Sequence, residues 1–261
     1  IGVKSFTYFP HNEDPYKSLY SKILLFDRKH GEPLALVDGT SVTFFRTAGV
    51  SALASQFLSR ENSEIFLLLG TGNLARFLIR AHASVRSLKK ILIWGRTKAN
   101  AQDVVADMQK ELPEIEFVLA ENIQTACDQA DIVVAATGSP DILVQGDWIK
   151  EGTHTDFLGN HHADKRECDT ALVVKSKVYL DTYVNCFNEA GEVLLPIEEG
   201  VLKKEDIKGE LAELCKAEVK GRENDSEITL FKSVGSALSD LVGANHAFQS
   251  LLKSQKFKKN M

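Results

Sequence analysis

The segment from residue 63 to residue 85 constrains the fold of this 261-residue chain more than any other. It begins with "SEIFLLLG", a short apolar run ending at a glycine, which is typical of a strand buried on both faces of a parallel sheet. "TGNLARFLIRAHASV" follows, and its Leu74, Leu78, Ala81 and Val85 lie three or four residues apart, which predicts an amphipathic helix. A strand, a glycine turn and a helix in this order predict the opening of a dinucleotide-binding α/β fold.

Further apolar runs continue the same alternation along the chain. Strands are predicted at residues 89–95, 116–120, 130–137, 152–159 and 176–181, and helices at 97–112 and in a short stretch through Ala126. Strands that alternate with helices form parallel sheets with right-handed crossovers. The sequence therefore predicts an α/β protein with a Rossmann-type, doubly wound parallel sheet covered on both faces.

The two ends of the chain have a different pattern. "SKILLFDRKHGEPLALVDG" contains two strand-like runs around a turn at residues 29–32, which predicts an antiparallel hairpin. Residues 236–252 predict one closing amphipathic helix. We therefore expect a smaller α+β domain made of residues 1–46 and 235–261, and a dinucleotide-binding Rossmann domain over residues 47–234.

Composition excludes several classes of partner. The net charge of -5 argues against nucleic acid, because phosphate binding requires a basic surface. No apolar run approaches the roughly 18 residues of a membrane span. The four cysteines, Cys127, Cys168, Cys186 and Cys215, form no C-x-x-C pair, which favours reduced thiols in a cytoplasmic protein over a disulfide framework or a zinc site.

The hexapeptide "GTGNLA" matches the G-x-G-x-x-A fingerprint. Gly70 permits the tight turn, Gly72 lets the backbone approach a pyrophosphate, and Ala75 permits close packing of the helix on the strand. Free N–H groups at the helix start complete an anion site. We expect the whole turn, including Thr71, Asn73 and Leu74, to bind the cofactor; the alternative is a glycine-rich turn without a ligand.

The residues after the second predicted strand bear on the choice of cofactor. An acid at this position would bind the adenosine ribose and favour NAD. This chain instead has "WGRTK", in which Arg96 can grip a 2′-phosphate in a bidentate manner, with Thr97 and Lys98 beside it. We therefore expect NADPH or NADP to be preferred over NAD. The alternative is that Arg96 and Lys98 are solvated residues at a helix start.

Several segments, in the same order and over nearly the whole chain, resemble the ornithine cyclodeaminase/mu-crystallin family. They are "GVKSFTYFPHN", "DGTSVTFFRTAGVSALAS", the glycine turn, "ADIVVAATGSP", "EGTHTDFLGN", "KRECD", "EAGEVLLPIEEGVLKKEDI" and "TLFKSVGSALSD". "TYFPHN" and "ECD" look closest to the branch of cyclic ketimine reductases. The resemblance implies a homodimer that reduces Δ1-piperideine-2-carboxylate or Δ1-pyrroline-2-carboxylate to pipecolate or proline.

The resemblance also implies roles for the smaller domain. In the family this domain binds substrate and forms the dimer, and several dozen further residues usually precede the "GVK" segment. We therefore expect an N-terminally truncated domain, because this sequence begins at "IGVKSF". An inactive fragment is one possible consequence.

The family match assigns individual residues. Lys4 and Arg46 are implied to hold the substrate carboxylate, with Val234 and Gly235 lining the substrate pocket. The implied cofactor contacts outside the two turns are Ser18, Arg46, Thr47, Thr137, Gly138, Gly159, Lys165 and Ser233. The alternatives are that Lys4 is an exposed strand residue, that Arg46 is a surface residue at a helix start, and that "FKSVG" is a buried strand end.

"GNHHADKREC" at residues 159–168 is unusually rich in titratable groups. In the family's cyclodeaminases an aspartate acts as proton acceptor and donor at the position that matches His161, and its loss argues against cyclodeamination. Imidazole titrates near neutrality, so His161 is a candidate for catalytic proton transfer, or else a passive wall. We expect the adjacent His161 and His162 to point to different sides, and we predict no metal site.

These patterns leave several functions open. The favoured one is an imine reductase that acts on a small imino or amino acid. The enzyme alternatives are an ornithine cyclodeaminase or an alanine dehydrogenase of the same fold. A crystallin-like carrier that binds NADPH without turnover is the alternative outside enzymes.

Overall fold

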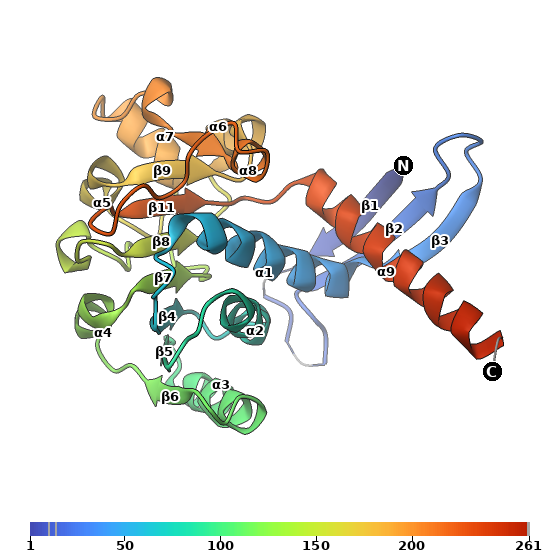
Figure 1. The fold of residues 1–261 in the computed structure, drawn as a ribbon, viewed down its shortest axis with the longest axis horizontal. Coiled ribbons are helices and arrows are strands. Elements are labelled where there is room, and N and C mark those ends of the chain that lie inside the picture. Colours follow the sequence, from blue (N-terminus) through green and yellow to red (C-terminus); the bar gives the residue numbers. More distant parts are fainter. Residues whose placement is uncertain (10, 14, 260–261) are drawn as a thin grey trace. The chain divides into compact units, whose positions relative to one another are not determined.

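The computed structural model describes residues 1–9, 11–13 and 15–259, and side chains as far as residue 254 (Figure 1). The chain divides into two compact units. The smaller unit comprises Ile1–Thr47 and Ser236–Met261, and the larger unit comprises Ala48–Gly235.

The larger unit is built on an eight-stranded parallel sheet with the order β10-β9-β11-β8-β7-β4-β5-β6. Its strands are β4 (Ile65–Leu69), β5 (Lys90–Trp94), β6 (Glu116–Leu119), β7 (Ile132–Ala135), β8 (His154–Phe157), β9 (Lys177–Leu180), β10 (Gly209–Glu210) and β11 (Thr229–Lys232). The predicted Rossmann-type parallel sheet is therefore confirmed. Two strands were missing from the predicted series: β10 has only two residues, and β11 was foreseen only in the alternative that "FKSVG" is a buried strand end.

Helices cover both faces of this sheet, as Figure 1 shows. They are α1 (Gly39–Leu58, shared by the two units), α2 (Ala75–Val85), α3 (Lys98–Glu111), α4 (Ile123–Gln129), α5 (Thr170–Lys175), α6 (Tyr183–Glu189), α7 (Gly191–Glu198) and α8 (Leu211–Cys215). Successive strand residues point to opposite faces. Leu68 accordingly packs in one core with Leu78 and Val104, whereas Leu67 packs in another with Cys127 and Leu172.

The smaller unit has a three-stranded antiparallel sheet of order β1-β2-β3, formed by β1 (Gly2–Tyr8), β2 (Leu19–Phe26) and β3 (Pro33–Asp38). The predicted hairpin is confirmed as β2 and β3, which pair antiparallel from Lys22 opposite Asp38. The closing helix α9 (Ala237–Lys259) packs on the sheet. Its Ala244 joins Ile23, Leu25 and Val42 in the core of this unit.

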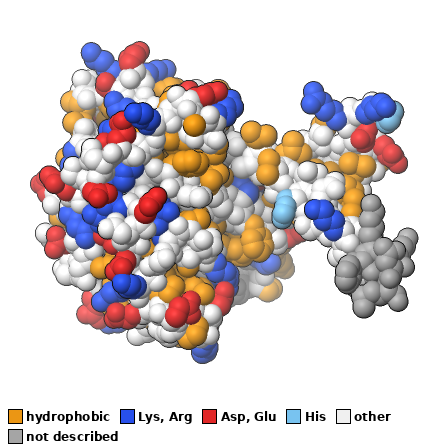
Figure 2. Space-filling model, viewed as in Figure 1, with side chains coloured by type: hydrophobic (Ala, Val, Ile, Leu, Met, Phe, Trp, Pro, Cys, Tyr) orange, Lys and Arg blue, Asp and Glu red, His pale blue; other side chains and the backbone are white. Residues whose placement is uncertain are grey.

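Among the described residues, no helix combines the length and apolar character needed to cross a bilayer. On the face shown in Figure 2, acidic and basic side chains lie intermixed over the larger unit. This mixture agrees with the modest net charge of -5.

Candidate active site

The glycine turn after β4 requires glycine at its first position. Gly70 has φ +115°, in the region that side-chain-bearing residues rarely adopt, and its N–H donates to the carbonyl oxygen of Trp94 over 2.9 Å. A Cβ at Gly70 would lie 2.5 Å from the carbonyl oxygen of Ala136 and 3.2 Å from Cγ2 of Thr137. The turn therefore packs directly against the backbone that follows β7.

The start of α2 offers backbone N–H groups to a ligand. The N-cap residue Leu74 supplies no side-chain cap, and Ala75 N donates to the carbonyl oxygen of Gly72 over 3.0 Å. Gly72 and Asn73 are exposed, whereas Ala75 is buried in the core beneath the helix. An uncapped helix N-terminus beside an exposed glycine fits the phosphates of a dinucleotide.

The residues after β5 adjoin this turn. A Cβ at Gly95 would lie 2.6 Å from Cγ2 of Thr71, so the two strand ends are in contact. Arg96 and Thr97 are exposed. Lys98 is exposed as well, but its Nζ lies 2.6 Å from Oε1 of Glu121, which makes it the less available cation.

The ends of β7 and β8 are joined by one buried carboxylate, Glu167. Its Oε1 accepts hydrogen bonds from the backbone N and Oγ1 of Thr137 at 2.8 and 2.7 Å, and its Oε2 accepts from Gly159 N at 2.7 Å. Burial raises the pKa of Glu167, and the opposing effects of Lys232 and of the Thr137 hydrogen bond lower it. Gly138, between these contacts in sequence, is exposed.

The segment after β11 is held in the same way by Asp181. Its Oδ2 accepts from Ser233 Oγ at 2.9 Å, from Val234 N at 3.0 Å and from Gly235 N at 2.6 Å. Gly235 has φ +92°. Ser233 is buried and its hydroxyl is already bonded to Asp181, whereas Val234 and Gly235 are partly exposed.

The two histidines of the loop after β8 do not point apart, and that expectation was wrong. The rings of His161 and His162 stack with centroids 4.6 Å apart and an interplanar angle of 28°. Consecutive side chains point apart in a strand, but this segment is a turn, in which that alternation does not hold. Partial desolvation, and next the charge of His162, lower the pKa of His161, while Glu189 opposes the shift. Lys165, at the end of the loop, is partly buried.

Within the smaller unit, Lys4 and Arg46 converge on one carboxylate. Lys4 Nζ and Arg46 Nε each lie 2.9 Å from Oδ1 of Asp240, and Lys4 Nζ also donates to Thr43 Oγ1 at 2.7 Å. The side chains of Lys4 and Arg46 are only 17% and 14% exposed. Burial lowers the pKa of Lys4, while Asp240 raises it and Arg46 lowers it. Two cations and one carboxylate leave an excess positive charge.

This geometry overturns the two surface alternatives. Lys4 belongs to β1 but is not an exposed strand residue, because α9 supplies its partner Asp240. Arg46 lies inside α1 rather than at its start, because the helix begins at Gly39. Thr47 follows it in α1, and Ser18 precedes β2, where its carbonyl oxygen accepts from Phe9 N at 2.8 Å.

Sequence reasoning missed three acids that organise these positions: Asp240, Glu167 and Asp181. Asp181 directly follows an apolar strand, which is a usable signal, since a carboxylate at a buried strand end needs hydrogen-bond donors from its neighbours. The only sequence signal for Glu167 was its position in the "KRECD" motif. Asp240 had only its place in the first turn of a helix, where acids are common for electrostatic reasons.

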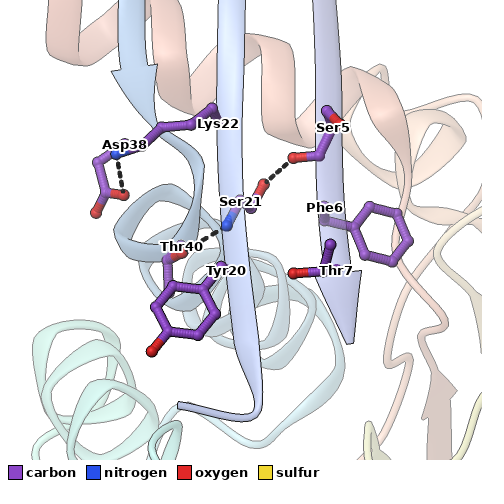
Figure 3. Close-up of a pocket in the computed structure, with 8 residues that line it drawn as sticks. All are labelled: Ser5, Phe6, Thr7, Tyr20, Ser21, Lys22, Asp38 and Thr40. Atoms are coloured by element: carbon purple, nitrogen blue, oxygen red, sulfur yellow. Dashed lines mark hydrogen bonds and ion pairs between the residues drawn. The ribbon is translucent and has the colours of Figure 1, made fainter. Parts of the chain in front are cut away.

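A concave surface of about 240 Å³ also lies on the smaller unit (Figure 3). Its residues are Ser5, Phe6, Thr7, Tyr20, Ser21, Lys22, Asp38 and Thr40. Its polar groups are largely occupied by one another, since Ser21 N donates to Thr40 Oγ1, Ser21 Oγ donates to the Ser5 carbonyl oxygen and Lys22 pairs with Asp38. None of the predicted site residues lines it.

Potential metal ligands are scattered. Within the part of the chain that the structure describes, no group of three or more histidine, cysteine, aspartate or glutamate residues could hold a metal ion. All four cysteines are free, and only Cys215 is exposed.

A doubly wound parallel sheet with an uncapped, glycine-led helix start defines a Rossmann-type dinucleotide-binding protein. The ornithine cyclodeaminase/mu-crystallin family model matches residues 1–255, and the chain belongs to this family. A Δ1-pyrroline-2-carboxylate reductase from Colwellia psychrerythraea is 47% identical over 253 residues, which cover 96% of this chain and 80% of the relative.

Two solved structures have the same fold. The Thermococcus litoralis Δ1-pyrroline-2-carboxylate reductase, in complex with NADH and L-proline, is 37% identical with a TM-score of 0.92, over 97% of this chain and 79% of the other. An archaeal alanine dehydrogenase dimer with bound NAD is 26% identical with a TM-score of 0.91, over 97% of this chain and 78% of the other. The resemblance inferred from motifs is thereby confirmed.

Proposed function

We propose that this chain is a nicotinamide-dependent reductase of a cyclic imino acid, converting Δ1-pyrroline-2-carboxylate to proline or Δ1-piperideine-2-carboxylate to pipecolate. The observation that carries the proposal is the pair of cations, Lys4 and Arg46, that share the single carboxylate of Asp240. An α-imino acid is an anion at its carboxylate, and an excess of buried positive charge suits it. The reductase relatives in the same family support the choice of substrate.

The residues of the larger unit fit a dinucleotide. The open space beside the exposed Gly72 and the uncapped start of α2 suit the pyrophosphate. Thr137, Gly138, Gly159, Lys165 and Ser233 would hold the nicotinamide half. When bound, the cofactor supplies a hydride.

The protein's own part in the reaction is binding, orientation and proton supply. Lys4 and Arg46 hold the carboxylate of the substrate. The imine carbon gains the hydride and the imine nitrogen carries the added proton, so that C=N becomes CH–NH. Partial desolvation lowers the pKa of His161, which disfavours its protonated form. We therefore infer that the imine arrives protonated and that His161 forms a wall of the site.

We further propose that NADPH is preferred over NADH. Arg96 is exposed beside the glycine turn, and its guanidinium has no partner among the described residues. A 2′-phosphate would pair with this free cation, whereas Lys98 is already paired with Glu121. The two solved relatives contain NADH and NAD, so the preference for NADPH is a separate proposal that rests on Arg96.

We also propose a cytoplasmic homodimer formed through the open face of the small sheet. Val3, Leu24 and Leu36 lie opposite one another across β1, β2 and β3 and are 54%, 44% and 65% exposed. A contiguous apolar row of this kind is typical of a protein interface. The dimeric archaeal relative supports this assignment, and the free cysteines suit a reducing compartment.

The test is the rate of NADPH absorbance loss with the five-membered and the six-membered cyclic imino acid. We expect turnover with at least one ring. Turnover only of pyruvate with ammonia would instead favour an alanine dehydrogenase, and formation of proline and ammonia from ornithine with NAD would favour a cyclodeaminase. Tight NADPH binding without turnover of any of these compounds would favour a carrier and refute the reductase.

A further inference from the structure

Three fully buried ionisable side chains lie under the loop that follows β8. They are Lys232 at the end of β11, Glu192 in the first turn of α7, and Glu167. Lys232 Nζ and Glu192 Oε2 form an ion pair of 2.7 Å in which neither side chain is exposed. Because the desolvation of two buried charges offsets most of their attraction, such a group is a poor means of stabilising a fold. Its place among the strand ends requires another explanation.

The contacts of Glu167 show what the group holds. One carboxylate accepts three hydrogen bonds, two from Thr137 after β7 and one from Gly159 N after β8. A Cβ at Gly159 would lie 2.5 Å from Oε1 of Glu167, so the carboxylate fits against this glycine without spare room. Glu167 thereby ties together the two backbone segments that follow neighbouring strands of the sheet.

The other two charges hold Glu167 and the loop. Glu192 Oε1 accepts from the backbone N of Glu167 at 2.9 Å. Lys232 Nζ donates to the carbonyl oxygen of Asn160 at 2.6 Å, one residue beyond Gly159.

The far end of the loop is fixed by α7. A Cβ at Gly191 would press on the carbonyl oxygen of Lys165 and would lie 3.0 Å from that of His162. Residues 159–165 are therefore held at one end by buried, paired charges and packed at the other end against the backbone of α7.

We propose that Glu167 is a positioning residue for hydride transfer, acting by clamping the backbones of Thr137 and Gly159 at the nicotinamide end of the site. This inference rests on the proposed function and deepens it. Backbone displacements near 1 Å at a reacting centre cost rate by about a hundredfold, so a clamp of this kind bears on kcat. Arg96, proposed to bind the adenosine end of the cofactor, follows β5, which β4 separates from β7 in the sheet.

The sharpest variant is Glu167→Gln. An amide has one acceptor oxygen, which can still receive both Thr137 donors, but its NH2 group then faces the N–H of Gly159. Two donors cannot bond to each other, so this substitution opens the clamp on one side only while keeping the size of the side chain.

Asp131→Asn is the matched control, at the other end of β7. Asp131 is also buried, and its Oδ2 accepts from the backbone N of Glu64 and of Ile65 at 2.9 and 3.0 Å, while Oδ1 pairs with Arg60 at 2.6 Å. Its loss tests the effect of breaking a structural carboxylate clamp in the same sheet, away from the strand ends that carry the site.

The experiment measures kcat, the primary isotope effect with NADPH deuterated at the transferred position, and the Kd of 2′,5′-ADP by calorimetry. For Glu167→Gln we expect kcat to fall about tenfold or more, the isotope effect on kcat to rise, and the Kd of 2′,5′-ADP to stay within about twofold. For Asp131→Asn the isotope effect should remain that of the wild type.

Other outcomes overturn the inference. An active wild type whose Glu167→Gln variant keeps the same kcat and isotope effect refutes the positioning role alone. Equal losses in both variants with unchanged isotope effects mean that Glu167 is merely structural. A wild type that oxidises neither NADPH nor NADH with either imino acid refutes the proposed function, and the positioning role with it.

Gly191→Ala gives a second test should Glu167→Gln fail to fold. The added methyl presses on the Lys165 carbonyl and displaces the loop from α7 without removing a charge. The same pattern is expected: lower kcat, a larger isotope effect and an unchanged Kd of 2′,5′-ADP. Wild-type kinetics in this variant would show that the loop position does not matter and would overturn the proposal.

Discussion

Replacing Arg46 by glutamine is the most direct test of the carboxylate anchor. The change removes one of the two cations that share Asp240 and leaves Lys4 and Asp240 as a pair without net charge. A hydrogen bond to a charged group contributes about 1.5–3 kcal/mol, which corresponds to a loss of about 10- to 150-fold in kcat/KM. Arg46 is largely buried, so salt will screen the interaction little.

The substrate can be truncated in parallel with the protein. Δ1-Pyrroline lacks the carboxylate, and the wild-type enzyme should discriminate against it strongly. In Arg46→Gln the discrimination should shrink, because the group that recognises the carboxylate is gone, and the two losses should not add. Initial rates of NADPH oxidation, measured for the wild type and for Arg46→Gln with each of the two compounds, give the four kcat/KM values that this comparison needs.

Two controls separate anchoring from general damage. Lys22→Gln breaks an ion pair with Asp38 in the same sheet whose side chains are well exposed, and exposed pairs contribute little. Arg46→Lys keeps the charge but loses the bidentate fork and should be intermediate. The anchor assignment is refuted if Arg46→Gln retains wild-type kcat/KM, or if its discrimination against Δ1-pyrroline is unchanged.

Three further predictions are simpler. Arg96→Gln should lower kcat/KM for NADPH about tenfold and leave NADH nearly unaffected; equal effects on both cofactors would contradict the 2′-phosphate assignment. The double substitution Leu24→Lys and Leu36→Lys places charge on the apolar face and should convert the dimer to a monomer. Light scattering measures the mass, and an unchanged mass would place the interface elsewhere. Burial lowers the pKa of His82 to about 4, whereas the unfolded chain titrates near 6.5. Above pH 6.5 the imidazole of His82 is mostly neutral in both the folded and the unfolded state. As the pH falls from 6.5 to 4 the unfolded state gains a proton that the folded state does not, which lowers the free energy of unfolding by about 3 kcal/mol. Urea unfolding should show a smaller loss over this pH range in His82→Gln and an unchanged loss in His30→Gln, where the replaced side chain is exposed.

The parts that sequence predicts well are those whose information is local. The glycine turn at Gly70 could be recognised because the apolar run before it, the positive φ it needs and the helix after it all lie within about 20 residues. The hairpin of β2 and β3 is local in the same sense, with both strands and their turn in one segment. Six strands of the parallel sheet, β4 to β9, could be predicted from their own segments, and most of these are apolar runs.

Helix α1 shows where local information fails. Val42 packs with Ile23 and Leu25 in one core, whereas Ala54 and Leu58 pack with a different core that contains Tyr179. A helix that contacts two sets of partners along its length does not keep one apolar stripe, and periodicity is the signal on which helix prediction depends. The position of Arg46 inside this helix was missed for the same reason.

The buried charges reveal a different limit. Read locally, Lys232 in "TLFKSVG" is a cation at the end of a strand, and such a residue is ordinarily solvated. It is buried because Glu192, 40 residues earlier, and the carbonyl oxygen of Asn160 meet it in three dimensions. No pattern within either segment specifies that encounter, since a buried charge is tolerated only when its partner is already in place. The same coupling makes these residues informative: a set of charges that costs free energy to bury, placed where β7, β8 and β11 end, is better explained by the geometry it imposes on the site than by any contribution to stability.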